Sequence, residues 1–223
     1  MIRLFGFLWI LLLGKANAQT YFQSYPKEVE AVDAFKRRHA TTLDSIFNKY
    51  KINASLALSI VAPEIGHYSI FQDKMEVSVV TLFYVEMGSE YNNFSIGYYQ
   101  MKPKFAERVE QETFEWRLKG FESILFFKNA EPKAMREERV QRLQSVKYQT
   151  AYLAAFIKIC ERKAPHWFKA NEPPVKLLAA AYNYGFWNEE KSIIDWQQIK
   201  NFPKKNAFAY ADVAQEYFNH FKK

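Results

Sequence analysis

The chain has 223 residues, a formal net charge of +7, and an aromatic content of 17%. This length fits one domain with a substantial hydrophobic core. The basic residues are spread along the chain and form no stripe, which argues against a nucleic-acid-binding protein. A single cysteine, Cys160, excludes an internal disulfide, and its apolar neighbours indicate a buried structural role.

Residues 1–18 have the pattern of a secretory signal peptide. Arg3 precedes an apolar run, and Ala16-Asn17-Ala18 has the small-x-small form of a signal peptidase site. The run is too short to span a bilayer comfortably, although an uncleaved anchor is the alternative. We therefore expect export across the inner membrane to the periplasm or cell envelope, with 19–223 as the mature chain and no membrane span left after cleavage.

The pattern of apolar residues, prolines and caps predicts an almost wholly helical fold. Proline or asparagine stands at several predicted helix starts, and the apolar residues that follow repeat at helical spacing. The predicted helices cover residues 26–50, 54–62, 71–87, 103–118, 140–162, 173–184 and 206–221. Residues 129–138 are expected to form a surface connection and 186–205 a loop. A short extended piece near 95–101 is the one departure from helix, and nothing indicates a second domain within 19–223.

Glu64 is the first candidate for chemistry. It follows the segment 54–62, which is apolar on nearly every side and is expected in the middle of the domain. No lysine or arginine lies within nine residues of Glu64. Burial against apolar groups raises the pKa of a carboxyl group, as a general acid for glycoside cleavage requires. By spacing alone, an ordinary solvent-exposed glutamate at a helix end is the alternative.

Two later segments accompany Glu64 in a familiar order. Gly97-Tyr98-Tyr99-Gln100-Met101-Lys102-Pro103 has the form Gly-x-x-Gln-apolar-x-Pro, and Ala180-Ala181-Tyr182-Asn183-Tyr184-Gly185 has the form Ala-Ala-Tyr-Asn-x-Gly. Together with a glutamate at the end of a buried helix, they resemble the lytic transglycosylases and goose-type lysozymes of the lysozyme-like superfamily. The segment 207–213 looks like a variant of this family's entry into its closing helix. The resemblance covers roughly residues 55–217.

The resemblance implies a mainly α, lysozyme-like fold with at most a short extended segment near the cleft. It also implies roles for individual residues. Glu64 would be the general acid and base, Gln100 would contact the sugar, and Tyr182 would hold the Glu64 carboxyl group by a hydrogen bond. The other candidates for substrate binding are Gly97 in the turn, Ser69 as the serine nearest to Glu64, Asn183 as a support of the helix end, and Tyr99 and Trp187, which either stack on sugar rings or pack in the core.

Two features depart from the family pattern. Ile65 stands where serine usually follows the catalytic glutamate, and the gap between Glu64 and Gly97 is long enough to hold a whole predicted helix. Glu76 and Glu86 are therefore alternatives to Glu64, although an exposed helix face explains both. The same departures leave room for a non-catalytic relative that binds peptidoglycan or an envelope protein partner, or for a helical envelope scaffold without a sugar site.

The activity that the resemblance implies is cleavage of peptidoglycan glycan strands by one glutamate, giving 1,6-anhydromuramic products as lytic transglycosylases do. A hydrolytic muramidase would need a second carboxylate, for which Asp73, Glu76, Glu86 and Glu90 are candidates. No cofactor is expected. No metal is expected either, because His67 has no second ligand at a recognisable spacing.

Overall fold

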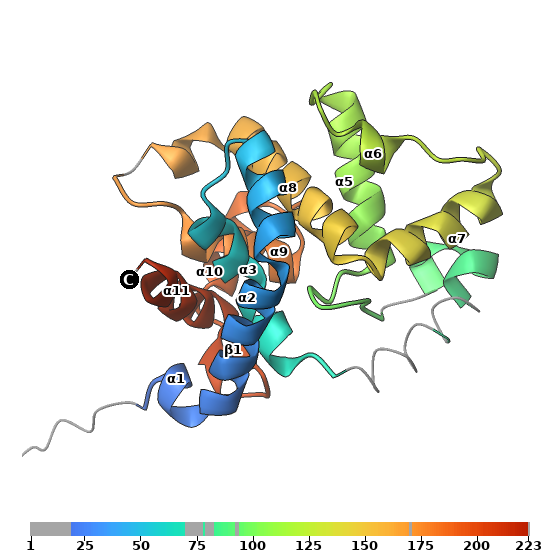
Figure 1. Cartoon of the computed structure of the whole chain (residues 1–223). Helices are drawn as coiled ribbons and strands as arrows, with labels where there is room; N and C mark the ends of the chain where they lie inside the picture. The colour runs from blue at the N-terminus through green and yellow to red at the C-terminus, as the bar shows by residue number, and fades with distance from the viewer. Residues whose placement is uncertain (1–18, 70–77, 79–82, 92–93, 170, 223) are drawn as a thin grey trace, which may run out of the picture.

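The computed structural model describes residues 19–69, 78, 83–91, 94–169 and 171–222. These residues are mainly helical and include one short two-stranded sheet, which confirms the mainly α class. Figure 1 shows two groups of helices joined by the long helix α8 (Val146–Lys163). No helix among the described residues combines the length and apolarity needed to cross a membrane.

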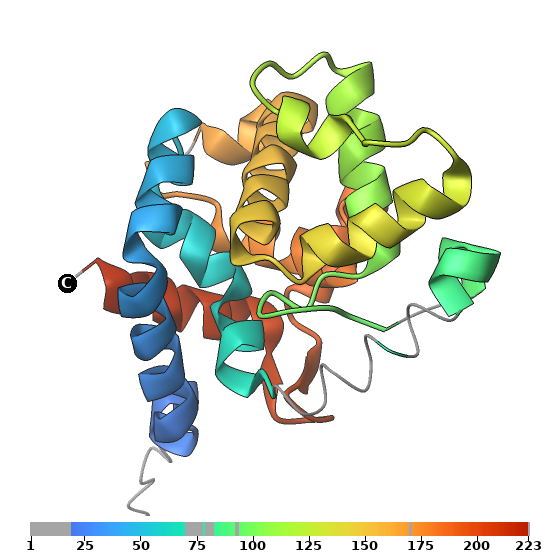
Figure 2. The same cartoon turned by 45° about the vertical axis from the view of Figure 1, so that its right-hand side comes forward.

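The first group surrounds α3, which contacts α2, α8, α9 and α11. Figure 2 shows α3, in teal, beside α2, in blue, and across α11, in dark red. Residues 56–63 of α3 are all buried because that helix is apolar on nearly every side, as the sequence predicts. The elements of this group are α1 (Tyr21–Ser24), α2 (Pro26–Lys49), α3 (Ala54–His67), η2 (Pro165–Phe168), α9 (Val175–Tyr184), α10 (Glu190–Trp196), β1 (Lys200–Phe202), β2 (Phe208–Ala209) and α11 (Tyr210–Phe221).

The second group packs on the other side of α8 and is held by a buried ion pair. Arg139 donates from Nε and Nη2 to the carboxylate of Glu110, at 2.9 and 2.6 Å, and Tyr152 donates to the same carboxylate at 2.5 Å. Tyr84 lies against Arg139 and donates to Glu107 at 2.7 Å. The named elements of this group are η1 (Ser89–Tyr91), α5 (Pro103–Glu115), α6 (Glu122–Leu125) and α7 (Pro132–Leu143).

Several predicted helix boundaries are confirmed. Pro26 begins α2 and Pro103 begins α5, because proline suits the first position of a helix, where its missing N–H is not needed. Asn53 caps α3 by accepting a hydrogen bond from the Leu56 amide at 2.9 Å. The helix predicted over 71–87 lies largely outside the described residues, but 83–87 are helical and end before Gly88, where φ is +92°.

The end of α3 differs from the prediction and changes the position of Glu64. The helix continues through Pro63 to His67 instead of ending at Ala62, so Glu64 lies in its last turns. Pro63 removes one N–H from the helix, but Ile65 just beyond it is only 3% exposed. Its burial favours continuation of the helix.

The predicted single helix over 140–162 is wrong. It is two helices, α7 and α8, separated at Ser145, whose backbone is extended. Helix α7 also begins inside the expected surface connection, because Pro132 stands at its first turn and Glu131 caps it. The break turns α7 away from α8, so that Arg139 reaches Glu110 on α5 and Arg142 donates to the Ile124 carbonyl at 2.8 Å.

The predicted loop over 186–205 is also wrong, since it contains α10 and β1. Ile193 is buried, and the Trp196 ring stacks on Tyr184 with 4.5 Å between ring centroids, which fixes α10 against the end of α9. Strand β1 pairs with β2, so α11 begins at Tyr210 and not at 206.

Candidate active site

A cavity of about 320 Å³ lies where the end of α3, the turn before α5 and the end of α9 meet. The sequence places these three segments far apart, and the packing of α3 against α9 brings two of them together. Five of the eight residues expected at the site line this space, Gly97 shapes the turn beside it, and Tyr99 and Ser69 do not line it. The residues of its lining that matter most for chemistry are Glu64, Gln100, Lys102, Tyr182, Asn183 and Trp187.

The turn that carries Gln100 is a tight hairpin. Ile96 and Met101 form an isolated antiparallel bridge, with N···O distances of 3.0 and 3.1 Å, which agrees with the extended piece expected near 95–101. Gly97 has φ of +70°, and a Cβ there would come within 2.6 Å of the Leu143 carbonyl and of the Gln149 side chain. Only glycine fits, so Gly97 shapes the turn.

Gln149 fastens this hairpin to the first turn of α8. Its Nε2 donates to the Ile96 carbonyl at 2.7 Å, and its Oε1 accepts from the Tyr99 amide at 3.3 Å. Gln100 itself has φ of +47°, a conformation that costs a non-glycine residue about 1 kcal/mol. Its backbone N–H and its Nε2 both donate to the Gly97 carbonyl at 2.9 Å. The hairpin therefore holds the Gln100 amide in the wall of the cavity.

Glu64 is partly buried and faces the cavity from the last turns of α3. Burial raises the pKa of its carboxyl group to about 7, while the positive charge of Lys102 and a hydrogen bond from Tyr210 act in the opposite direction. Glu64 forms no ion pair with any residue that the structure describes. Its carboxyl group can therefore be protonated near neutral pH.

The hydrogen bond to Glu64 comes from a different tyrosine than the sequence suggested. The Tyr182 hydroxyl group is close to Glu64, but it donates to the Tyr99 carbonyl at 2.6 Å. Tyr210, at the first position of α11, is the hydrogen-bond partner of Glu64, and its one hydroxyl proton can go either to Glu64 or to the Ile60 carbonyl at 2.9 Å. The role expected of Tyr182 is thus corrected. Tyr182 joins the α9 segment to the hairpin, and Tyr210 holds the carboxyl group.

The end of α9 is shaped by Gly185. Its φ is +117°, and a Cβ there would lie 2.8 Å from the Trp187 ring, so the ring lies directly over the glycine. Trp187 is partly buried and lines the cavity, while the neighbouring Phe186 is 5% exposed and belongs to the core. Asn183 also lines the cavity, and its Oδ1 accepts from Trp196 Nε1 at 2.9 Å. Asn183 thereby supports the helix end, as expected.

Two candidates lie elsewhere. Tyr99 is fully buried, and its hydroxyl group forms a hydrogen bond with Thr150 at 3.0 Å, so its ring has no face for a sugar. It packs in the core and contributes only its backbone carbonyl, which binds Tyr182. Ser69 follows the end of α3, is exposed, and is not part of the cavity lining. Substrate contacts at Tyr99 and Ser69 are therefore not what the geometry supports.

Sequence reasoning missed Lys102 and Tyr210. Lys102 lies between Met101 and Pro103, two positions after Gln100, so its place beside the turn was a usable signal. Burial lowers the pKa of Lys102, and the negative charge of Glu64 opposes that effect. Tyr210 belongs to the segment 207–213, which resembles the segment that leads into the closing helix of lytic transglycosylases. That resemblance implied no role for Tyr210.

The two described candidates for a second carboxylate, Glu86 and Glu90, do not line the cavity with Glu64. Asp73 and Glu76 lie outside the described residues. Glu86 pairs with Lys133 at 2.6 Å, and Glu90 pairs with Lys104 at 2.8 Å. Among the described residues that line the cavity, Glu64 is the only one with a carboxylate side chain.

Comparisons of the chain with protein-family models, with curated proteins and with solved structures found no match.

Proposed function

We propose that this protein cleaves the glycan strands of peptidoglycan as a lytic transglycosylase, with Glu64 as its one catalytic acid and base. The observation that carries the proposal is the state of Glu64. Its carboxyl group has a pKa raised to about 7, forms no ion pair within the described part of the chain, and faces a cavity shared with Gln100, Tyr182 and Asn183. The export signal that we expect over residues 1–18 supports a substrate in the cell envelope.

In the first step, protonated Glu64 donates its proton to the oxygen that links N-acetylmuramic acid to N-acetylglucosamine, and the bond from that oxygen to C1 breaks. In the second step, the Glu64 carboxylate accepts the proton of the muramic C6 hydroxyl group as O6 bonds to C1. The products are a 1,6-anhydromuramic end and a free N-acetylglucosamine end. No second carboxylate is needed, because the substrate's own hydroxyl group replaces water.

A pKa near 7 suits both steps, because the group must release a proton and then take one back. Tyr210 can follow this change of charge. Its hydroxyl group has one proton, which it donates to the Ile60 carbonyl at 2.9 Å. When Glu64 is ionised, we expect that proton to turn toward the carboxylate, since hydrogen bonds to charged groups are the stronger ones. Lys102 adds a positive charge on the same side.

The test is digestion of purified peptidoglycan by residues 19–223 and by the Glu64→Gln variant, with the released muropeptides analysed by mass spectrometry. We expect anhydro products from the unmodified chain and at least a ~1000-fold loss in the variant, because glutamine cannot transfer the proton. Glu137→Gln is the matched control, since Glu137 is exposed on α7 and does not line the cavity. Reducing-end products would indicate a muramidase instead. Binding without products from either protein would favour the non-catalytic alternative.

A further inference from the structure

A second cavity, of about 460 Å³, lies at the far end of α5 from Glu64. Phe105, near the start of α5, lines the Glu64 cavity, whereas Leu118, just after its end, lines the second one. These 13 positions of a mostly helical segment separate the two cavities by roughly 20 Å. They share no lining residue. Whatever binds in the second cavity is therefore not held by the residues around Glu64.

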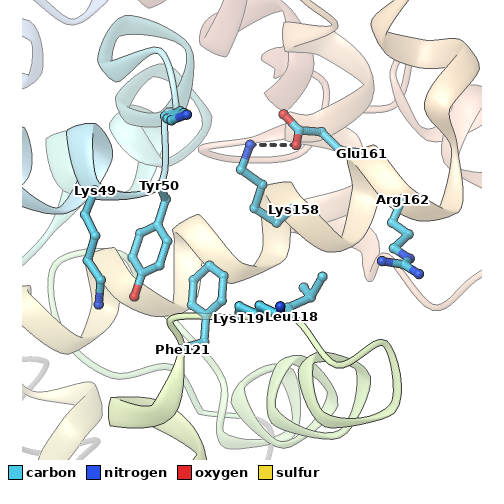
Figure 3. Close-up of a pocket in the computed structure, with 9 residues that line it drawn as sticks. Lys49, Tyr50, Leu118, Lys119, Phe121, Lys158, Glu161 and Arg162 are labelled. Atoms are coloured by element: carbon cyan, nitrogen blue, oxygen red, sulfur yellow. Dashed lines mark hydrogen bonds and ion pairs between the residues drawn. The ribbon is translucent and has the colours of Figure 1, made fainter.

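The lining of this second cavity is strongly basic. Its charged residues are Lys49, Lys51, Lys119, Lys158, Arg162 and Glu161, five cations and one anion. Glu161 is already paired with Lys158 at 2.7 Å, as Figure 3 shows, so it neutralises only that lysine. The remaining cations come from three separate segments, the end of α2, the loop after α5 and the end of α8. Such a convergence of one charge sign attracts an anionic ligand.

The cavity also has a rigid aromatic wall. The rings of Tyr50 and Phe121 stack with 4.0 Å between centroids and an interplanar angle of 4° (Figure 3). The Tyr50 hydroxyl group and Lys49 Nζ both donate to the Gly120 carbonyl, at 2.7 and 2.9 Å. These contacts fix the loop after α5 against the end of α2, so the basic side chains project from a fixed frame. The wall is formed before any ligand arrives.

An apolar cavity of about 260 Å³ adjoins the basic one. The two cavities share Lys51 and Glu161, so they form one groove with a basic half and an apolar half. The apolar half takes its name from six of its eleven lining residues, Ile52, Leu56, Ile157, Phe168, Pro173 and Pro174; the others are Lys51 and Glu161, which it shares with the basic half, and Asn53, Asn171 and Glu172 at its polar edge. The volume of the apolar half suits one or two large side chains. It is smaller than the volume that a long acyl chain occupies.

We propose that this groove binds a peptide segment of a partner protein in which acidic residues are followed by large apolar ones. The acidic side chains would lie against Lys51, Lys119 and Arg162, and an apolar side chain would fill the adjoining half. The combination of charge and apolar area selects this occupant over a simple anion, because an anion would leave the apolar half unused. The groove would recruit a partner while the Glu64 cavity stays open to its own ligand.

The experiment measures fluorescence anisotropy of three labelled peptides titrated with residues 19–223 at low salt: DEDEFL, its uncharged counterpart NQNQFL, which should not bind, and DEDEGG, which lacks the apolar end. Two variants carry equal changes of charge. Lys51→Glu with Lys119→Glu alters the groove, and Lys204→Glu with Lys205→Glu alters an exposed loop elsewhere. All four lysines are exposed, so both variants should fold, which circular dichroism verifies.

We expect the charged peptide to bind and the groove variant to weaken its binding at least tenfold, with the loop variant changing it less than twofold. Leu56→Ala, in the apolar half, should weaken binding of DEDEFL but not of DEDEGG. No binding of the charged peptide, or equal weakening in both charge variants, would overturn the proposal. Binding to phosphatidylglycerol vesicles that depends on the groove lysines, without peptide binding, would overturn the choice of a peptide. These outcomes are independent of peptidoglycan cleavage.

Discussion

Two glutamates buried on helices behave differently in this molecule. Glu110 on α5 is 8% exposed and shares its carboxylate with Arg139 and Tyr152. Glu64 on α3 is partly buried, has Lys102 nearby without an ion pair, and has a pKa raised to about 7. Burial disfavours the charge of both, but only Glu110 has a guanidinium group to stabilise it. The comparison teaches that the partner, more than the burial, separates a structural carboxylate from one suited to proton transfer.

The largest expected effect comes from removing the partner of Glu110. Arg139→Met should lower the free energy of unfolding by about 3–5 kcal/mol, because it leaves a buried carboxylate uncompensated. Urea unfolding measures this change. Lys133→Met is the control, because it removes a half-exposed pair with Glu86 and should alter the stability by less than about 1 kcal/mol. Similar effects from both variants would mean that the Arg139 pair is not a special structural element.

Next comes the stability effect of Glu64 itself. Its pKa is raised from 4.5 to about 7 on folding, so its protonated form stabilises the native state at low pH, and this contribution is lost as the pH rises through 7. Glu64→Gln removes that dependence. The difference in unfolding free energy between variant and unmodified chain should change by about 3 kcal/mol from pH 4 to pH 8, in favour of the variant at pH 8. A difference that stays constant with pH would contradict the raised pKa.

A smaller effect is expected from Tyr210→Phe. It removes the hydrogen bond that stabilises the charged form of Glu64, so the pKa of Glu64 should rise further. We expect about a tenfold loss of kcat and a shift of the basic limb of the pH–rate profile to higher pH. Tyr182→Phe should leave that limb in place, because its hydroxyl group donates to Tyr99. If the two variants shift the limb equally, the assignment of Tyr210 is wrong.

The smallest effect should come from Lys102→Met. Loss of the nearby positive charge raises the pKa of Glu64, so the basic limb moves upward again, with kcat at its optimum changed only about threefold. High salt should reproduce part of this shift in the unmodified chain, because dissolved ions weaken the interaction of charges that lie near the surface. A shift of the limb to lower pH would show that Lys102 does not act on Glu64 as a positive charge.

The sequence predicted helix starts and the turn well, because prolines, caps and glycines act locally. Pro26, Pro103 and Asn53 each mark the start that the structure has, and Gly97 marks a turn that no other residue fits. The break at Ser145 was not predictable in this way. The break accompanies the hydrogen bond from Arg139 to Glu110, a contact made only in the folded chain and absent from the apolar periodicity.

The candidate site was predictable to a similar extent. Glu64, Gln100, Tyr182, Asn183 and Trp187 all line one cavity, as the ordered motifs suggested. The hydrogen-bond partner of Glu64 was not predictable from the sequence. Tyr210 is 146 residues further along the chain and reaches Glu64 only through the packing of α11 on α3. Tyr99 was equally ambiguous on sequence, because an aromatic residue in a turn can face either the cavity or the core.

The hydrogen bond from Tyr182 to the Tyr99 carbonyl joins two segments that are 83 residues apart. At 2.6 Å it leaves little freedom for either segment to move alone. The Gly97 turn and the Ala180–Gly185 helix end should therefore be inherited as a pair. In an alignment of relatives, a lengthened turn should occur together with loss of the tyrosine at position 182, and either change alone should be rare.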